Sequence, residues 1–375
     1  MNKVTVLILS LIFIVGCQRK TSTGDCIEYI DSLKINLENT TLRVALIDLT
    51  LKNNIRPYTI FFDNHLIVLN KQDSFYTFHL DCFNRDTIYE KKLNTKEFKK
   101  AFVAFDNLYG IDVNNQAFRY ENKTAEWVKS NNLPLLNNTP IYENDKYICY
   151  RVFSLKMGGF VFFYDKQTEK TTFVPADHAV SLMEQRLNGF YIVEQWGEIG
   201  HGSSITKIEN PDSLFRLSDT LSYYDNIWEE MDFYYSVMQA NTTIENKKYS
   251  NLAVFGEEIS SQTSDIYIYG IDEKFITSGF KIKDDNYFIL NNYKDIYLTK
   301  LQDDSLVVIN TVDIVFSGLP SNEGEITRKI NNNTIIDYSH SSHDDSKSWF
   351  ENEYSNHLLT TFIINDTTLI RINWY

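Results

Sequence analysis

The chain has 375 residues, a formal net charge of −14 and 43% hydrophobic residues. This apolar fraction is enough to build a core, which excludes an intrinsically disordered chain, and the length allows two domains or one large all-β unit. A negative charge of this size repels phosphate groups, so we expect no nucleic-acid partner.

The chain begins with a short basic and apolar leader. Lys3 is followed by twelve mostly apolar residues from Val4 to Val15. As a helix, this run would rise only about 18 Å, well short of the roughly 30 Å hydrocarbon core of a bilayer. We therefore interpret residues 1–16 as a signal peptide and not as a transmembrane helix.

The leader ends in the sequence Ile14-Val15-Gly16-Cys17. This resembles the lipobox of bacterial lipoproteins, in which branched apolar residues and a small residue precede a cysteine. The resemblance implies that the Cys17 thiol carries a diacylglyceryl group and that acyl chains anchor the mature protein in a membrane. The alternative is an ordinary cleaved signal peptide, but no A-x-A-like site precedes the polar stretch after Cys17.

Residues 17–39 are predicted to be the lipidated cysteine and a tether, since residues 18–24 are polar. Gln18 occupies the position where an inner-membrane retention signal of the familiar lipoprotein type would have Asp, and no acidic cluster follows it. By resemblance to lipoproteins we expect an outer-membrane location that faces the periplasm, with the membrane as a partner through Cys17.

From residue 40 to residue 375 we expect one all-β domain. Residues 40–51 form an N-terminal strand that could pair with the last strands of the chain and remove an exposed edge. After it, groups of four short strand-like segments recur, joined by turns that contain Asn or Asp. The clearest groups span residues 58–93, 101–131, 139–177 and 178–219.

The turn between the first and second segment of each group serves as a marker of the repeat. The markers are Asn64, Asn107, Asp145, Asn188, Asn251, Asn286 and Asn333, at intervals of 43, 38, 43, 63, 35 and 47 residues. A four-stranded β-propeller blade takes about 40–45 residues, and an insertion at residues 218–243 accounts for the long interval. The pattern predicts a β-propeller of six or seven four-stranded blades, with a pair of β-sandwiches as the competing fold.

A lipobox followed by blade-like segments such as LIVLNKQDSFYTFHLD (residues 66–81) resembles the β-propeller lipoproteins of Gram-negative bacteria. The resemblance covers most of residues 58–375 and matches no named propeller subfamily. Because no strong catalytic motif is present, we favour a membrane-anchored, non-catalytic binding or scaffold module for a protein or a glycan. We expect no cofactor.

The candidate catalytic residues lie in one glycine-rich segment, residues 194–203. It places Glu194, Glu198 and His201 between two expected strands, with Trp196 as a candidate binding residue. Two carboxyl groups roughly 5–9.5 Å apart would support glycoside hydrolysis, so the alternative function is a periplasmic glycan-acting enzyme that uses this loop. The simpler interpretation is a flexible turn at the rim of the ring.

The insertion at residues 218–243 is rich in aromatic residues. Tyr224, Trp228 and Tyr234 could stack on sugar rings or contact a protein partner. The alternative is a short helix that buries these rings against the outside of the propeller.

A second polar cluster contains Asp337, His340, His343, Asp344 and Asp345, of which His340, His343 and Asp344 are the candidate metal ligands. Imidazole and carboxylate groups are suitable ligands for a metal ion. Spacing within a loop does not fix a coordination geometry, so the alternative is a solvated polar loop.

Replacing Cys17 with serine should prevent lipidation, because a serine hydroxyl does not take the thioether-linked lipid. The variant should remain as unprocessed precursor and should not incorporate radioactive palmitate. The measurement is palmitate labelling together with the mobility of the protein on a denaturing gel. Labelling that persists in Cys17→Ser would contradict the interpretation of the leader.

Overall fold

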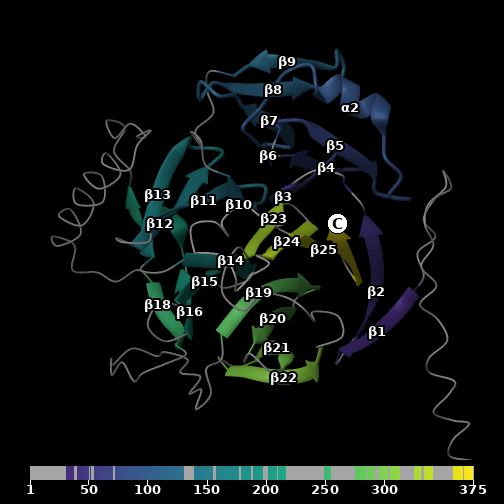
Figure 1. Ribbon diagram of the computed structural model, residues 1–375. Helices are drawn as coiled ribbons and strands as arrows, with labels where there is room; N and C mark the ends of the chain where they lie inside the picture. The colour runs from purple at the N-terminus through teal and green to yellow at the C-terminus, as the bar shows by residue number, and fades with distance from the viewer. Residues whose placement is uncertain are drawn as a thin grey trace, which may run out of the picture.

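Six groups of consecutive strands lie around a common centre (Figure 1). The computed structural model describes residues 31–37, 40–49, 51, 55–70, 72–130, 139–154, 158–176, 179–186, 189–196, 202–208, 210–216, 249–254, 275–283, 285–291, 295–302, 305–312, 325–330, 333–340, 358–365 and 367–374. Strands dominate these residues, and consecutive strands within each group are antiparallel. The predicted all-β propeller fold is therefore confirmed, and we call the groups blades 1 to 6.

The first three blades follow each other directly in the sequence. Blade 1 consists of β3 (Ile55–Phe62), β4 (His65–Asn70), β5 (Phe75–His79) and the helix α2 (Thr87–Leu93). Blade 2 consists of β6 (Lys100–Ala104), β7 (Asn107–Ile111), β8 (Ala117–Glu121) and β9 (Glu126–Lys129). Blade 3 consists of β10 (Pro140–Glu143), β11 (Tyr147–Ser154), β12 (Gly158–Asp165) and β13 (Lys170–Ala176).

The remaining blades contain longer connections. Blade 4 consists of β14 (Ala179–Arg186), β15 (Gly189–Trp196), β16 (Gly202–Ile208) and β18 (Tyr249–Val254). Blade 5 consists of β19 (Phe275–Ile282), β20 (Asp285–Asn291), β21 (Ile296–Gln302) and β22 (Ser305–Thr311). Blade 6 consists of β23 (Glu325–Ile330), β24 (Asn333–His340), β25 (Leu358–Asn365) and β26 (Thr368–Trp374), and it is extended by β2 (Thr40–Leu49) and β1 (Asp31–Leu37).

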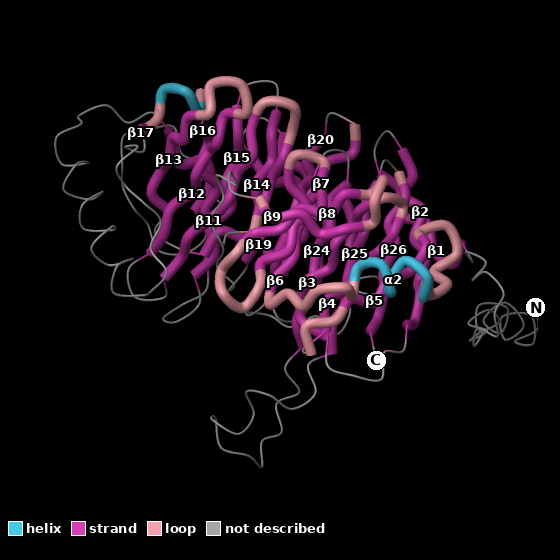
Figure 2. Tube along the Cα trace, turned by 90° about the horizontal axis from the view of Figure 1, so that it is seen from above, coloured by secondary structure: helices cyan, strands magenta, loops and turns pink. Residues whose placement is uncertain are grey.

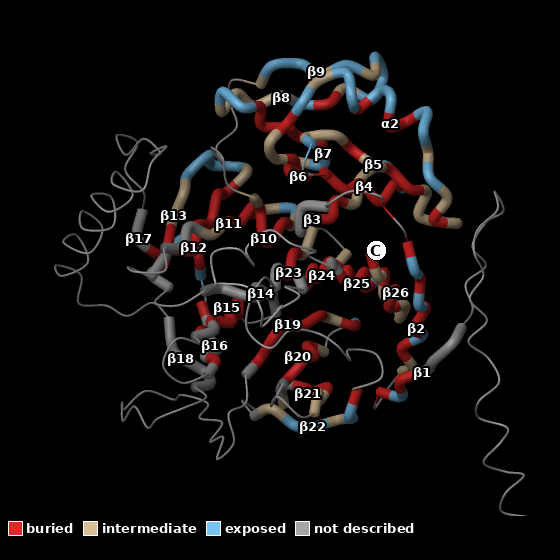
Figure 3. Tube along the Cα trace, viewed as in Figure 1, coloured by how far each residue is buried: buried red, intermediate tan, exposed pale blue. Residues whose placement is uncertain are grey.

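The central strands of the blades are buried on both faces. In β11, Ile148 and Tyr150 pack against blade 2, whereas Tyr147 and Cys149 pack against blade 4. Successive side chains of a strand point to opposite faces, so stacking between two neighbours requires apolar residues at every position. Figure 3 shows the result, with buried segments along the middle strands and exposed segments on the outer strand β9.

Residues 87–93 form the helix α2, so the prediction of a fourth strand in blade 1 was wrong. Asp86 caps the helix, because its Oδ1 accepts hydrogen bonds from the N–H groups of Ile88 (3.0 Å) and Tyr89 (2.9 Å). Tyr89 and Leu93 lie one turn apart and are buried in the core between blades 1 and 2. Capping and this spacing outweigh the β-propensity of the segment, and α2 lies against β5 (Figures 1 and 2).

The described residues hold six blades, because the marker at Asn251 does not lie in a turn between the first two strands of a blade. Asn251 lies in β18, which pairs with β16 as the outermost strand of blade 4. Residues 213–219 were expected to supply this strand, but they contribute β17 (Phe215–Arg216) to blade 3. The predicted insertion at 218–243 lies outside the described residues. No helix among the described residues is long and apolar enough to cross a membrane.

The N-terminal strands close the ring. β2 pairs in parallel with β26, from Arg43 opposite Thr368 to Leu49 opposite Trp374, and β1 pairs with β2. The expected pairing of residues 40–51 with the last strands is therefore confirmed. β1 lies within the segment predicted as a tether, so residues 31–37 belong to blade 6 instead.

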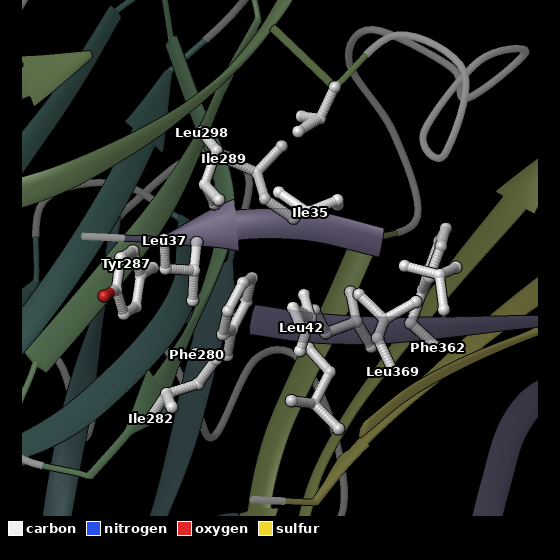
Figure 4. Packing of buried hydrophobic residues seen from close by; sticks show 14 of the residues in the cluster. Ile35, Leu37, Leu42, Phe280, Ile282, Tyr287, Ile289, Leu298, Phe362 and Leu369 are labelled. Carbon is white, nitrogen blue, oxygen red and sulfur yellow. The ribbon is translucent and has the colours of Figure 1, made fainter. Parts of the chain in front are cut away.

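Blade 6 fills the space between blades 5 and 1. On one face of the extended sheet, Ile35, Leu37 and Leu42 pack with Phe280 and other apolar residues of blade 5 (Figure 4). On the opposite face of β2, Ala45, Ile47 and Leu49 pack with residues of blade 1. The N-terminal strands thereby join the last blade to both of its neighbours.

Truncation of Leu42 should destabilise the whole ring. Leu42 is 0% exposed in the core between blades 5 and 6, whereas Leu46 on the same strand is 44% exposed. We expect Leu42→Ala to lower the free energy of unfolding by about 2–5 kcal/mol. The matched control Leu46→Ala should change it by less than about 0.5 kcal/mol. Urea denaturation measures both, and equal losses would contradict this packing.

Candidate functional site

A cleft of about 330 Å³ lies between blades 1, 2 and 6. Its walls come from β3, from the turns that follow β3, β6 and β8, and from β23 and β24. The volume falls within the range of roughly 300–1,000 Å³ that is usual for small-ligand pockets. We take this cleft as the candidate functional site.

The innermost strand of blade 6 lines the cleft and also contacts blade 3. The innermost strand of blade 6, β23, pairs in parallel with β10, the innermost strand of blade 3. Figure 1 shows β23 beside both β10 and β24. The cleft itself is lined by residues of blades 1, 2 and 6.

A buried ion pair borders the cleft. Arg328 Nη2 of β23 lies 2.6 Å from Asp337 Oδ2 of β24, and both side chains are almost fully buried. Arg328 also donates to the carbonyl oxygen of Thr59 (2.5 Å), and Asp337 Oδ2 accepts from the Thr59 N–H (2.9 Å). The pair thus satisfies both backbone groups of a residue in β3, the innermost strand of blade 1. Removing one partner of such a pair costs about 3–5 kcal/mol, because it leaves an uncompensated buried charge.

The remaining oxygen of Asp337 connects the outer strands of blade 6. Thr361 Oγ1 of β25 donates to Asp337 Oδ1 (2.6 Å). The same hydroxyl accepts a hydrogen bond from Trp374 Nε1 of β26 (2.9 Å). Four strands of blade 6 therefore converge on one carboxylate, which fixes the position of Arg328 at the cleft.

Tyr58 lies over this ion pair. The guanidinium carbon of Arg328 is 3.9 Å from the centre of the Tyr58 ring, a cation–π contact. Burial raises the pKa of Tyr58 to about 12, and the positive charge of Arg328 offsets part of this rise. The phenol is therefore neutral at physiological pH. Arg328 Nη1 is buried and has no hydrogen-bond partner among the described residues.

The rim of the cleft carries exposed polar groups. Asp63 (φ 50°) and Asp106 (φ 56°) lie in the tight turns after β3 and β6, in the left-handed region that Asp tolerates better than most residues. Asn122 comes from the turn after β8. These groups can form hydrogen bonds with hydroxyl groups, while the rings of Tyr58 and Phe61 offer apolar surface beside them.

The structure places Glu194 away from this cleft. It lies on β15, is buried, and its Oε1 is 3.4 Å from Thr206 Oγ1 of β16. Trp196 is the last residue of β15 and is opposite Gly202, but its side chain is outside the described part. Glu198 and His201 lie outside the described residues, so the proposed carboxyl pair is untested.

The other candidates fall mainly on residues that the structure does not describe. His340 is the last residue of β24, opposite Leu358, and only its backbone is described. Asp337 of β24 is buried, and its carboxylate is held by Arg328 and Thr361. Outside the described residues are Cys17, Tyr224, Trp228, Tyr234, His343 and Asp344.

Sequence reasoning missed the residues of the cleft, although one pattern points to its rim. The tripeptide Phe-Asp-Asn occurs at residues 62–64 and again at 105–107, one blade later. The two turns nevertheless differ, because Asp63 is the first residue with positive φ in its turn and Asp106 is the second. Nothing in the sequence brings Arg328 to these turns, since it lies more than two hundred residues away.

No family model matches this chain, and the search of curated proteins found no match to it. Among solved structures, the tricorn protease is 9% identical with a TM-score of 0.38, over 86% of this chain and 26% of that chain. PorZ, a surface component of the type-IX secretion system of Porphyromonas gingivalis, is 10% identical with a TM-score of 0.36, over 84% and 51%. The Swd1 β-propeller domain of Myceliophteria thermophila is 9% identical with a TM-score of 0.35, over 74% and 78%.

This chain thus spans about a quarter of the tricorn protease and about half of PorZ. At these identities and TM-scores, the likeness transfers no site or activity to this chain.

Replacing Tyr58 with phenylalanine should reduce the loss of folding stability that occurs as the pH rises above 10. Folded Tyr58 keeps its proton up to a pH of about 12, whereas an unfolded tyrosine has a pKa of 10.0. The contribution of protonated Tyr58 to the unfolding free energy is complete below pH 10. It disappears as the pH rises through the pKa of Tyr58 in the folded protein. Between these values the wild type should lose about 2 kcal/mol of unfolding free energy that Tyr58→Phe retains. Urea denaturation at stepped pH measures this, and parallel losses would refute it.

Proposed function

We propose that this protein is a lipid-anchored β-propeller whose cleft between blades 1, 2 and 6 binds a glycan without catalysis. The observation that carries the proposal is the combination of groups in the cleft. Exposed carboxylates and an amide lie at its rim, aromatic rings lie beside them, and the buried Arg328 borders it. Sugars present hydroxyl groups together with apolar ring faces, and this set of groups suits both.

The size of the cleft favours a glycan over a protein ligand. A stable protein interface buries roughly 1,200–2,000 Å² and needs a broad surface. A concave space of about 330 Å³ instead fits a small ligand or the end of a chain. The acidic rim, together with the net charge of −14, favours ligands without negative charge.

Binding is favoured over hydrolysis because of the surroundings of the two acids. A catalytic acid in a glycosidase has its pKa raised by its surroundings, for example by burial in an apolar pocket. Asp63 and Asp106 are both exposed at the rim of the cleft. The alternative, a glycan-acting enzyme that uses residues 194–203, depends on Glu198 and His201, and a test of Glu198→Gln for loss of turnover would decide it.

The proposed membrane anchor is inferred from the resemblance of residues 14–17 to a lipobox. Thirteen residues separate Cys17 from β1, and at full extension they span at most about 45 Å. An acylated Cys17 would therefore hold the propeller close to the bilayer, in our proposal at the periplasmic side of the outer membrane. A cleft held at this distance would meet glycans of the surrounding envelope.

The double variant Asp63→Asn with Asp106→Asn tests the binding function. Asn keeps the left-handed turn geometry but removes both carboxylates, so we expect at least a tenfold weaker affinity for neutral oligosaccharides with little change in melting temperature. The measurement is a glycan array with the chain from residue 18, followed by calorimetry on the best ligand.

Glu126→Gln on the outer strand β9 is the matched control, because it removes an exposed carboxylate away from the cleft. It should leave binding unchanged. Binding of no oligosaccharide by the wild type, or equal binding by the double variant, would refute the proposed glycan function.

A further inference from the structure

Two histidines and one aspartate converge on blade 1, outside the set of residues that line the cleft. His65 is the first residue of β4, His79 is the last residue of β5, and Asp86 is the N-cap of α2. The Nε2 atoms of both histidines lie 3.2 Å from Asp86 Oδ2. One potential ligand atom from each residue lies within 4.8 Å of the others.

The hairpin of β4 and β5 brings the histidines together. His65 and His79 are direct partners in this antiparallel ladder. Residues directly opposite each other in such a ladder project side by side from the same face of the sheet. The two imidazole rings accordingly lie with their centres 4.7 Å apart.

The segment that follows β5 brings Asp86 next to the two histidines. The His79 N–H donates to the Asn84 carbonyl (3.0 Å), and the Phe83 N–H donates to the His79 carbonyl (2.7 Å). Asp86 is then fixed to β5, since its N–H donates to the Thr77 carbonyl (2.9 Å) and its carbonyl accepts from Thr77 Oγ1 (2.8 Å). The carboxylate is therefore positioned by the backbone.

The His65 ring is held in one orientation. Its Nδ1 lies 2.7 Å from the carbonyl oxygen of Asp63, and its face stacks on Tyr89 with ring centres 4.2 Å apart. A carbonyl oxygen only accepts hydrogen bonds, so Nδ1 must carry the proton. In a neutral imidazole the lone pair then lies on Nε2, the nitrogen that faces Asp86. Fixing the second nitrogen in this way is the usual means by which proteins orient a metal-binding histidine.

This arrangement places two acceptors against each other. The Nε2 lone pair of neutral His65 faces a carboxylate oxygen 3.2 Å away, and neither atom can donate. A cation must therefore be shared between them, either a second proton on His65 or a metal ion. A metal ion also satisfies the Nε2 of His79, which lies at the same distance from the same oxygen.

The two His–Asp distances and the donor types suit zinc. A tetrahedral site with bonds of about 2.0–2.1 Å has ligand atoms about 3.3 Å apart, close to the two 3.2 Å separations observed here. Asp86 Oδ1 is occupied by the N–H groups of Ile88 and Tyr89, so Oδ2 is left to act as a single ligand atom. The His79 side chain is 45% exposed, which leaves room for a solvent molecule in the fourth position.

We propose that His65, His79 and Asp86 bind one divalent first-row transition-metal ion, with Zn²⁺ as the best fit and a solvent molecule as the fourth ligand. The ion would join the β4–β5 hairpin to the N-terminus of α2. It would thereby hold this helix in the place that a fourth strand takes in blade 2. This site is independent of the glycan function, which does not require a metal.

The test uses the mature chain after removal of metal ions with a chelator. We expect calorimetric titration with Zn²⁺ to show saturable binding, and Co²⁺ to give the intense visible absorption of a tetrahedral site. His79→Ala and Asp86→Asn should each weaken this binding more than tenfold. Asn is as good an N-cap as Asp, so Asp86→Asn keeps α2 capped while removing the anionic ligand.

Two controls separate this site from other possibilities. Asp81→Asn makes the same charge change in the same loop, at an exposed residue that is not part of the cluster, and should bind Zn²⁺ as the wild type does. The double variant His340→Ala with His343→Ala removes the other histidine cluster and should also retain this ion. Absence of binding by the wild type would assign the shared cation to a proton on His65 and overturn the proposal. Undiminished binding by both His79→Ala and Asp86→Asn would overturn it as well.

Discussion

The parallel pairing of β2 with β26 is the constraint on which the ring depends. A propeller made from one chain leaves its first and last blades without a covalent connection, and each would expose an apolar face. Here the N-terminal strands join the last blade, so that one face of β2 packs on blade 5 and the other on blade 1. Seven consecutive residue pairs, from Arg43–Thr368 to Leu49–Trp374, hold this junction together. Because its two strands lie at opposite ends of the sequence, the ring closes only when almost the whole chain has folded.

A buried polar cluster works alongside this apolar closure at the centre of the ring. The ion pair between Arg328 and Asp337 binds both backbone groups of Thr59, and so ties the innermost strand of blade 1 to blade 6. Hydrogen bonds are directional, whereas apolar packing tolerates sliding. The cluster therefore sets the position of β3 relative to β23, and that position creates the cleft. The same residues thus serve stability and shape the candidate binding site.

Much of the fold was predictable from short stretches of sequence. Tight turns and strands buried on both faces each require particular residue types at neighbouring positions. The turn at Asp63-Asn64 requires two residues with positive φ, which few residue types allow. The predictions were wrong where the structure depends on contacts between segments that are far apart in the sequence. Residues 87–93 contain β-forming residues but become helical because Asp86 caps them and blade 2 covers Tyr89 and Leu93. The strand that contains Asn251 belongs to blade 4, although a long segment separates it from β16.

The sequence by itself determined the all-β character and the repeat of about forty residues, because both depend on residue types at short, fixed spacings. It also held the information that pairs His65 with His79, since a hairpin whose turn is known defines its own register. Only the tertiary structure decided which blade each late strand joins and which residues meet at the cleft. Arg328 reaches Tyr58 across most of the chain, and such a contact follows from how the blades close around a centre. Ring closure is a property of all six blades together, and no single stretch of sequence carries it.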